Sequence, residues 1–339
     1  MFEHIRSRIG HAQRQAKEVS RIGEFVNKSK DKSKHDKYLH LQAFERIPIP
    51  WSNIFKSDAK IVVEIGFGSG EYLCTLAERY PNKNFVGFDT SLTSVEKTLT
   101  KLEKLRLQNA RVARVDGRFA LRELFADNSV EHVIVNFPCP WPKKRHSRRR
   151  LTREDFVETL GAVLEPGGIF ELATDVEWFA REMAETLKKT RSFSKLAIIT
   201  NPDRPLKTRY ERKWLSQGRT IYLLKAEKTG HIHIERTVTG GLPHTKIKKM
   251  DIKKLTQMKG QIWQEGEKVV VIKDVYHDLD QKNWLVLTYS SDSDFQQHYY
   301  ILITKKGDGF LVKLDSTTVP FRTPAVKWSV FRLAEEIGV

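Results

Sequence analysis

The feature that most constrains the fold is a regular alternation of short apolar and longer amphipathic stretches between residues 60 and 228. The first apolar stretch, IVVEIG, precedes EYLCTLAERY, whose apolar residues recur every three or four positions, as on one face of a helix. Four similar pairs follow, and a last apolar stretch, RTIYLLKAEK, ends at residue 228. Strands that alternate with helices form a parallel sheet, because parallel strands need a crossover connection. We therefore predict an α/β domain with helices on both faces of a mostly parallel sheet.

A different pattern begins near residue 230, where the helical period disappears. Polar turns such as DLDQKN and KKGDG separate the stretches KVVVIKDVYHD, NWLVLTYSS, HYYILITKK, GFLVKLD and VKWSVFRLAEE. All five are predicted to be strands of an additional C-terminal antiparallel β domain. Its aromatic residues could stack on nucleic-acid bases, but at strand spacing we favour a place in the core for them. They are Trp284, Tyr299, Tyr300, Phe310 and Trp328.

The chain is thereby predicted to have three parts: a basic N-terminal segment (1–37), an α/β domain (38–229) and a β domain (230–339). Residues 5–26 carry apolar side chains at helical spacing with arginines and lysines largely off that stripe, and a lysine-rich polar linker follows. Two interpretations of this helix stand: it binds RNA, or it packs its apolar stripe against another part of the protein.

Composition indicates a polyanionic partner. The 59 lysines and arginines exceed the 42 acidic residues and give a net charge of +17, which favours nucleic acid. Two cysteines are too few for a disulfide scaffold or a cysteine-based zinc site, and we expect no metal. No stretch has the pattern of a signal peptide or the length of a membrane span, so we expect a cytoplasmic protein with no membrane partner.

The first predicted strand runs directly into a glycine loop, Gly66, Gly68 and Gly70. Glycine lets the backbone turn sharply and approach a ligand closely. Dinucleotide-binding loops need a further glycine at position 71, where this chain has Glu71. A carboxylate at that helix start would repel a pyrophosphate. The loop therefore suits a nucleoside ligand without phosphates, of which S-adenosylmethionine is one.

Acidic residues lie at the ends of the first three predicted strands. Glu64 lies beside the glycine loop, and Asp89, nineteen residues after Gly70, is placed to accept both ribose hydroxyls. Asp116 follows the third strand, where it could accept the adenine amino group. The alternative is that all three are unrelated surface acids that cap helices.

After the fourth strand comes the stretch VNFPCPWPKKRHSRRRLT. Its prolines cannot continue a central strand, so the strand ends at Asn136. Six of the eight residues from 143 to 150 are basic, and they could hold RNA phosphates while a target base enters the crevice. The alternative is a solvated charged surface. The six are Lys143, Lys144, Arg145, Arg148, Arg149 and Arg150.

From about residue 51 to 228 the chain resembles the bacterial single-subunit tRNA (guanine-N7)-methyltransferases. The resemblance is carried by EIGFGSG, FPCPWPKKRHSRRRL, LEPGGIFELATD and KTRYERKW. It implies a Rossmann-like class I methyltransferase fold with a seven-stranded sheet. It also implies methyl transfer from S-adenosylmethionine to N7 of guanosine 46 in the tRNA variable loop, with no obligate protein partner.

The functional residues of this family can be assigned to the matching positions of the chain. The resemblance implies that Glu64, Asp89 and Asp116 bind the cofactor, and that Lys143 and Asp175 bind the substrate. It further implies a closing substrate-binding segment, which consists of Thr208, Arg209, Tyr210 and Glu211. Thr208 and Glu211 also have the spacing of a helix capping box, and the two interpretations are compatible.

One position departs from the family. The family has aspartate in FPDPW, proposed as catalytic, and this chain has Cys139. The loss is tolerable because guanine N7 carries a lone pair and no proton, so that no general base is required. Asp175 and Glu211 could instead stabilise the positive charge that forms on the purine, and are candidate catalytic residues.

Other interpretations of Cys139 stay open. Pyrimidine C5 methyltransferases use a Pro-Cys nucleophile after the same strand, so an RNA cytosine methyltransferase is the enzymatic alternative. A non-catalytic RNA-binding protein on a methyltransferase scaffold is the other. We favour a passive Cys139, because the flanking WPKKRHSRRRL resembles the guanine enzymes.

Overall fold

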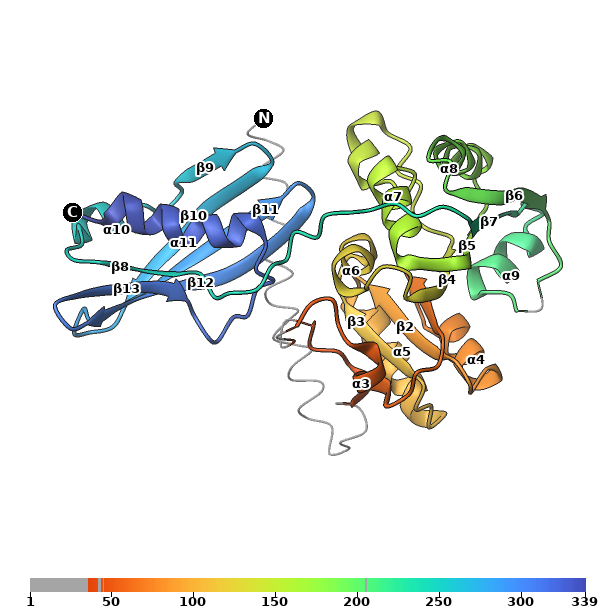
Figure 1. The fold of residues 1–339 in the computed structure, drawn as a ribbon, viewed down its shortest axis with the longest axis horizontal. Helices are drawn as coiled ribbons and strands as arrows, with labels where there is room; N and C mark the ends of the chain where they lie inside the picture. Colours follow the sequence, from red (N-terminus) through yellow and green to blue (C-terminus); the bar gives the residue numbers. More distant parts are fainter. Residues whose placement is uncertain (1–35, 42–43, 45, 205) are drawn as a thin grey trace. The chain divides into compact units, whose positions relative to one another are not determined.

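The computed structural model of this chain describes residues 36–41, 44, 46–204 and 206–339. These residues form two compact units, one containing residues 36–41 and Arg46–Arg236 and the other containing residue 44 and Thr237–Val339 (Figure 1). The predicted N-terminal helix and nearly all of the predicted linker lie outside the described residues.

The first unit is a seven-stranded, mostly parallel sheet with the strand order β3-β2-β1-β4-β5-β7-β6. Neighbours from β3 to β5 run parallel, while β7 is antiparallel to both β5 and β6. The Rossmann-like fold predicted from the sequence is thus confirmed. Its strands are β1 (Ile61–Ile65), β2 (Asn84–Asp89), β3 (Ala110–Arg114), β4 (Val130–Asn136), β5 (Leu164–Thr174), β6 (Phe193–Thr200) and β7 (Tyr222–Lys228).

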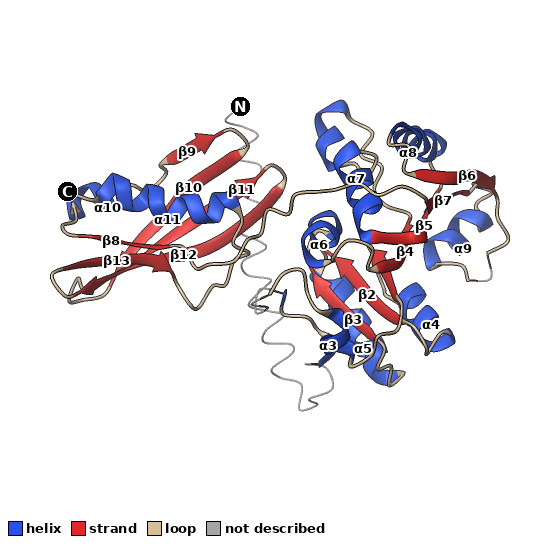
Figure 2. Cartoon of the chain, viewed as in Figure 1, coloured by secondary structure: helices blue, strands red, loops and turns tan. Residues whose placement is uncertain are grey.

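Helices flank this sheet, as Figure 2 shows. Their inward faces supply an apolar core, in which Leu73, Leu99 and the strand residue Val86 are fully buried. The elements are α3 (Trp51–Phe55), α4 (Glu71–Arg79), α5 (Leu92–Lys104), α6 (Gly117–Leu124), the 3₁₀ turn η2 (Lys144–Arg149), α7 (Glu154–Val163), α8 (Glu177–Lys189) and α9 (Arg209–Ser216).

The strand order reverses at β1, which pairs with β2 on one side and β4 on the other. In open α/β sheets a ligand crevice forms outside the carboxyl ends of the strands at such a reversal. The fold therefore places the glycine loop after β1 and the basic loop after β4 at the same end of two adjacent strands.

The second unit is a six-stranded antiparallel sheet, in the order β8-β13-β12-β11-β10-β9, which confirms the predicted β domain. Trp284 and Tyr299 are fully buried in its core, and Phe310 and Trp328 are partly buried against it, as favoured from the sequence. Tyr300 is an exception, because it is partly exposed and lies outside that core. Its elements are β8 (His244–Ile247), α10 (Ile252–Thr256), β9 (Ile262–Glu265), β10 (Lys268–His277), β11 (Asn283–Asp292), β12 (Phe295–Lys306), β13 (Gly309–Leu314) and α11 (Pro324–Ile337).

The prediction that VKWSVFRLAEE forms a strand is wrong, because this stretch lies in α11. Val326, Val330, Leu333 and Ile337 recur at intervals of three and four and are buried in the core of the unit. Pro324 occupies the first turn, where its missing N–H costs nothing. The pattern is that of a helix packed on a sheet, not of alternating strand faces.

Among the described residues, every helix is too short or too polar to cross a lipid bilayer.

Candidate active site

The glycine loop leaves β1 with three glycines in the left-handed region of φ: 76° at Gly66, 54° at Gly68 and 70° at Gly70. At Gly70 a Cβ atom would also lie 2.2 Å from Oγ1 of Thr98 on α5, so no other residue fits there. The Gly68 amide donates a hydrogen bond to Oδ2 of Asp89, at 2.9 Å. The loop is thereby attached to the end of β2.

Asp89 is half-buried and accepts a second backbone hydrogen bond, from Ser91 to Oδ1 at 2.8 Å. Burial raises the pKa of this carboxyl, while the bonds from Ser91 and Gly68 oppose the rise. Each carboxylate oxygen has two lone pairs, so each can accept a further hydrogen bond. Asp89 could thus accept two neighbouring hydroxyl groups from a ligand without losing its own partners.

Glu64 is almost fully buried in β1, with 2 % of its surface exposed. Its Oε1 atom accepts a hydrogen bond from Nδ2 of Asn136, whereas Oε2 has no partner among the described residues. Burial raises the pKa of Glu64 to about 7. A buried carboxylate oxygen without a partner is costly, and a cationic ligand group beside it would relieve that cost.

Asp116 caps α6 by accepting a hydrogen bond from the Arg118 amide at 2.9 Å, so the capping interpretation is confirmed for this acid. Its Oδ2 atom also pairs with the Arg118 guanidinium at 2.7 Å. The structure therefore brings the three acids to three adjacent strand ends, but Asp116 would have to share its carboxylate with a ligand.

A buried network connects Glu64 to the closing segment, and its centre is Arg204, which belongs to none of the sequence motifs described above. The Arg204 guanidinium donates to Glu211 at 2.9 Å, Glu171 at 3.2 Å and Oδ1 of Asn136 at 2.8 Å. It also donates to the Tyr72 hydroxyl at 3.0 Å. Burial alone would lower the pKa of Arg204, but these partners raise it above its ordinary value, so the side chain stays charged.

The closing segment forms the first turn of α9. The Glu211 amide donates to Oγ1 of Thr208, and Glu211 Oε2 accepts from the Thr208 amide, so the predicted capping box is confirmed. Glu211 is only 1 % exposed, and burial raises its pKa despite the neighbouring Arg204. Arg209 and Tyr210, in contrast, are exposed to solvent. The structure thus places Glu211 in the buried network, and only its neighbours at the surface.

Asp175 follows β5 and pairs through Oδ2 with Arg219, at 2.7 Å. The Arg219 guanidinium lies over the Trp214 ring of α9. Trp214 in turn packs edge-on against the Phe137 ring, with the ring centres 4.9 Å apart. These contacts bring the candidate residue Asp175, the closing helix and the loop after β4 together. Cys139 lies exposed in that same loop.

The basic loop contains η2, and five of its six predicted RNA-contacting side chains are exposed: Lys143, Lys144, Arg145, Arg148 and Arg149. Arg150 differs from them. It donates hydrogen bonds to the carbonyl oxygens of Trp141 and Pro142 and pairs with Glu182 of α8. The position of Arg150 indicates that it holds the loop in shape.

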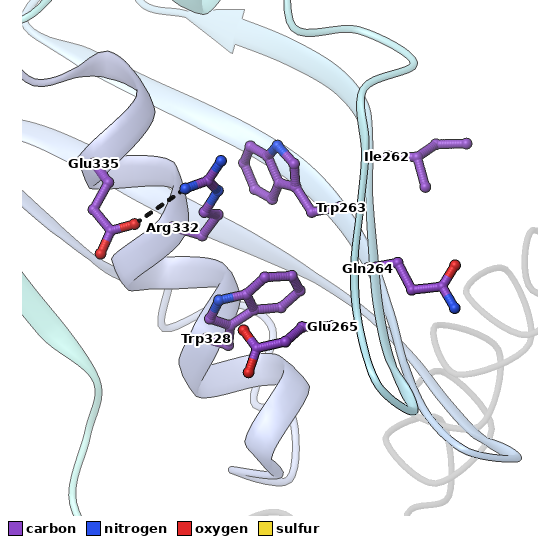
Figure 3. A pocket seen from close by; sticks show the side chains of 7 residues that line it. All are labelled: Ile262, Trp263, Gln264, Glu265, Trp328, Arg332 and Glu335. Carbon is purple, nitrogen blue, oxygen red and sulfur yellow. Dashed lines mark hydrogen bonds and ion pairs between the residues drawn. The ribbon is translucent and has the colours of Figure 1, made fainter.

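A hollow of about 590 Å³ lies on the second unit and is lined by Trp263, Trp328 and five further residues (Figure 3). Arg332 points into it but is paired with Glu335, and Glu265 adds another carboxylate. These acids would oppose the phosphates of RNA. The five further residues are Ile262, Gln264, Glu265, Arg332 and Glu335.

A Rossmann-like sheet whose reversal point carries a glycine loop and three carboxylates, without the glycine that a pyrophosphate needs, defines a methyltransferase of the Rossmann-like class. A family model described as "Putative methyltransferase" matches residues 58–224.

Three relatives named tRNA (guanine-N(7)-)-methyltransferase are similar over most of the chain. The protein from Thermotoga maritima is 46% identical over 303 residues, which cover 88% of this chain and 96% of the relative. The Aquifex aeolicus protein is 32% identical, covering 80% and 92%, and the Thermus thermophilus protein is 30% identical, covering 86% and 93%. This chain belongs to the tRNA (guanine-N(7)-)-methyltransferase family.

Proposed function

We propose that this protein transfers a methyl group from S-adenosylmethionine to N7 of guanosine 46 in the variable loop of tRNA. The observation that carries the proposal is that the glycine loop and the carboxylates Glu64 and Asp89 lie at the carboxyl ends of β1 and β2, next to the exposed basic loop that follows β4. The names of the relatives support guanine N7 as the target atom and tRNA as the substrate.

S-adenosylmethionine would supply an electrophilic methyl group on its sulfonium sulfur. The residues present fit this cofactor. Glu64 would place its unpaired Oε2 beside the ammonium group, and Asp89 would accept the ribose hydroxyls. Asp116 would accept the adenine amino group beside Arg118. Gly66 and Gly68 would leave room for the ligand, because a Cβ atom on either would meet open space, while Gly70 lets the loop pass close to Thr98 of α5.

The chemistry requires alignment more than proton transfer. The lone pair of guanine N7 would attack the methyl carbon that the cofactor supplies, and the electrons of the broken carbon–sulfur bond would stay on sulfur. Positive charge appears on the purine, and no proton leaves N7. Asp175, at the end of β5, would stabilise this charge as the base replaces Arg219 as its partner. Glu211 would act indirectly, since Arg204 already holds its carboxylate.

The exposed residues of the basic loop would bind tRNA phosphates: Lys143, Lys144, Arg145, Arg148 and Arg149. Thr208, Arg209 and Tyr210 would contact the nucleotide from the first turn of α9. Cys139, in this proposal, is a passive residue of the loop.

The test is to incubate the purified protein with S-adenosylmethionine and unmodified tRNA, digest the RNA and identify the methylated nucleoside by mass spectrometry. We expect 7-methylguanosine, and we expect it to disappear when guanosine 46 is replaced in the transcript. 5-Methylcytidine would instead identify Cys139 as a nucleophile. Bound tRNA without any methylation would overturn the proposal in favour of a binding scaffold.

A further inference from the structure

Outside the crevice, the segment after β7 has the sequence HIHIE and carries His231 and His233. The structure brings both to Asp127, in the loop between α6 and β4. One ligand atom from each residue lies within 4.8 Å of the other two. Among the residues that the structure describes, no other group of three histidine, cysteine or acidic side chains meets this criterion.

His231 and His233 alternate with two isoleucines that point toward the interior of the unit. Ile232 packs against α7, since a Cβ atom on Gly161 would lie 2.6 Å from its Cδ1 atom. Ile234 is buried, with 8 % of its surface exposed. In an extended segment, residues two apart point to the same side. His231 and His233 accordingly share the outer side, where both are exposed.

Asp127 is fixed by a different contact. Its Oδ1 atom pairs with Arg236 at 2.7 Å, and Arg236 is itself held by the carbonyl oxygen of Phe125 at 2.6 Å. The other carboxylate oxygen, Oδ2, faces Nε2 of His231 at 3.4 Å. A carboxylate that is oriented by a hydrogen bond on one oxygen and free on the other is a common arrangement for a metal ligand.

We propose that Asp127, His231 and His233 form a binding site for Zn²⁺. Two imidazole nitrogens and one carboxylate oxygen are a typical set of protein ligands for zinc, whose fourth position a water molecule fills. Tetrahedral zinc with bonds of about 2.0–2.1 Å needs ligand atoms roughly 3.3–3.5 Å apart, a spacing that small side-chain rotations would give here. Ca²⁺ and Mg²⁺ fit less well because they prefer oxygen ligands.

Two arginines beside the site limit the kinds of metal ion that it can bind. Arg236 neutralises part of the Asp127 charge, and Arg122 lies nearby, donating to the carbonyl oxygen of Glu235 at 2.6 Å. A site that attracts cations by charge alone would be weakened by these arginines. Affinity for a metal ion must therefore come from coordination bonds to the imidazole nitrogens, which suit zinc.

A zinc ion here would join the segment that leaves β7 to the loop before β4. Both belong to the methyltransferase unit, so the metal would fasten residues 231–233 to that unit. The site uses none of the residues proposed for cofactor or tRNA, so metal removal is expected to leave the rate of methyl transfer unchanged.

The test uses the full-length protein after treatment with a chelator. Calorimetric titration with Zn²⁺ should give one site per chain, and Co²⁺ should give the absorption of a tetrahedral complex. The double variant H231A/H233A should bind Zn²⁺ at least about tenfold more weakly, whereas H244A, an exposed histidine outside the cluster, should bind normally. Zn²⁺ should raise the thermal midpoint of the parent protein and not that of the double variant.

Three results would overturn the proposal. The first is no Zn²⁺ binding at all, and the second is Zn²⁺ binding that the double variant leaves unchanged. The third is weaker tRNA binding by the double variant in the presence of chelator, which would assign the histidines to RNA phosphates instead. Methylation by the metal-free parent protein reports separately on the proposed function.

Discussion

At the scale of single residues, the proposed role of Glu64 in cofactor binding predicts that this binding depends on pH. Its pKa of about 7 means that near neutrality the carboxyl is partly protonated before the cofactor binds. The ammonium group of S-adenosylmethionine favours the ionised form, so binding should release a proton. Cofactor affinity should rise as the pH rises through about 7, and fall on the acid side, where protonation of Glu64 competes.

Calorimetry in buffers of different ionisation enthalpy measures this proton release directly. The E64Q variant should bind S-adenosylmethionine about 10–100-fold more weakly, with no proton release. D89N is the matched control, since it should lose affinity and still release the proton. An unchanged pH dependence in E64Q would show that another group titrates.

Replacing Asp175 and replacing Cys139 should have different effects on the rate of methyl transfer. If Asp175 stabilises the cation on the purine, D175A should lower the rate of single turnover about 100-fold while tRNA binding persists. C139A should keep a rate within about threefold of the parent protein, because N7 needs no general base. Near-normal turnover by D175A would contradict the proposed role of Asp175. Loss of turnover in C139A would instead support Cys139 as a nucleophile.

At the scale of elements, the sequence predicts the sheet of the first unit well because strands buried on both faces read as continuous apolar runs. The edge strand β6 did not stand out, since half of its residues are exposed and the apolar run is broken. The strand prediction fails at α11 because Val326, Trp328 and Val330 alternate with Lys327 and Ser329, a local pattern that a strand shares with the start of this helix. Its partner sheet, which decides between the two, is not visible in the local sequence.

The same limit applies to the candidate sites. Glu64, the glycines and Asp89 could be found because each directly follows or ends a predicted strand. Arg204 could not, because its four partners come from α4, β4, β5 and α9, which only the folded chain brings together. The approach of Asp127 to His231 across more than a hundred residues is hidden for the same reason.

Arg204 should hold α9 in place, because it pairs with Glu211 in the first turn of that helix. R204M leaves Glu171 and Glu211 buried without their shared cation, which should lower the free energy of unfolding by about 3–5 kcal/mol. Urea denaturation measures the loss, which should shrink at lower pH because burial raises the pKa of Glu211, and its protonation removes one of the two uncompensated charges. R181M is the control: Arg181 pairs with Glu177 on the surface of α8, and its loss should cost at most about 0.5 kcal/mol. Equal effects of both variants would contradict the prediction.

At the scale of the whole molecule, two groups of relatives differ in how much of the chain they match. The Thermotoga maritima alignment covers 303 residues and therefore extends beyond the methyltransferase unit, whereas the Pectobacterium atrosepticum alignment covers 190. Both relatives are named for the same activity. The residues proposed for methyl transfer all lie in the first unit, and RNA binding and stability are the two roles that we consider for the second.

Salt dependence of tRNA binding separates these two roles. Each phosphate contact contributes about −0.7 to −0.9 to the slope of log K against log salt concentration. Replacing Lys144, Arg145 and Arg149 with alanine should therefore make the slope shallower by roughly 2–3. The matched triple variant replaces Lys246, Lys305 and Lys306, which are exposed on the second unit. An unchanged slope in this second variant would indicate that these lysines do not contact tRNA phosphates and serve solubility instead. A shallower slope would instead add the β domain to the tRNA-binding surface, since counterion release reports only the cations that meet phosphate.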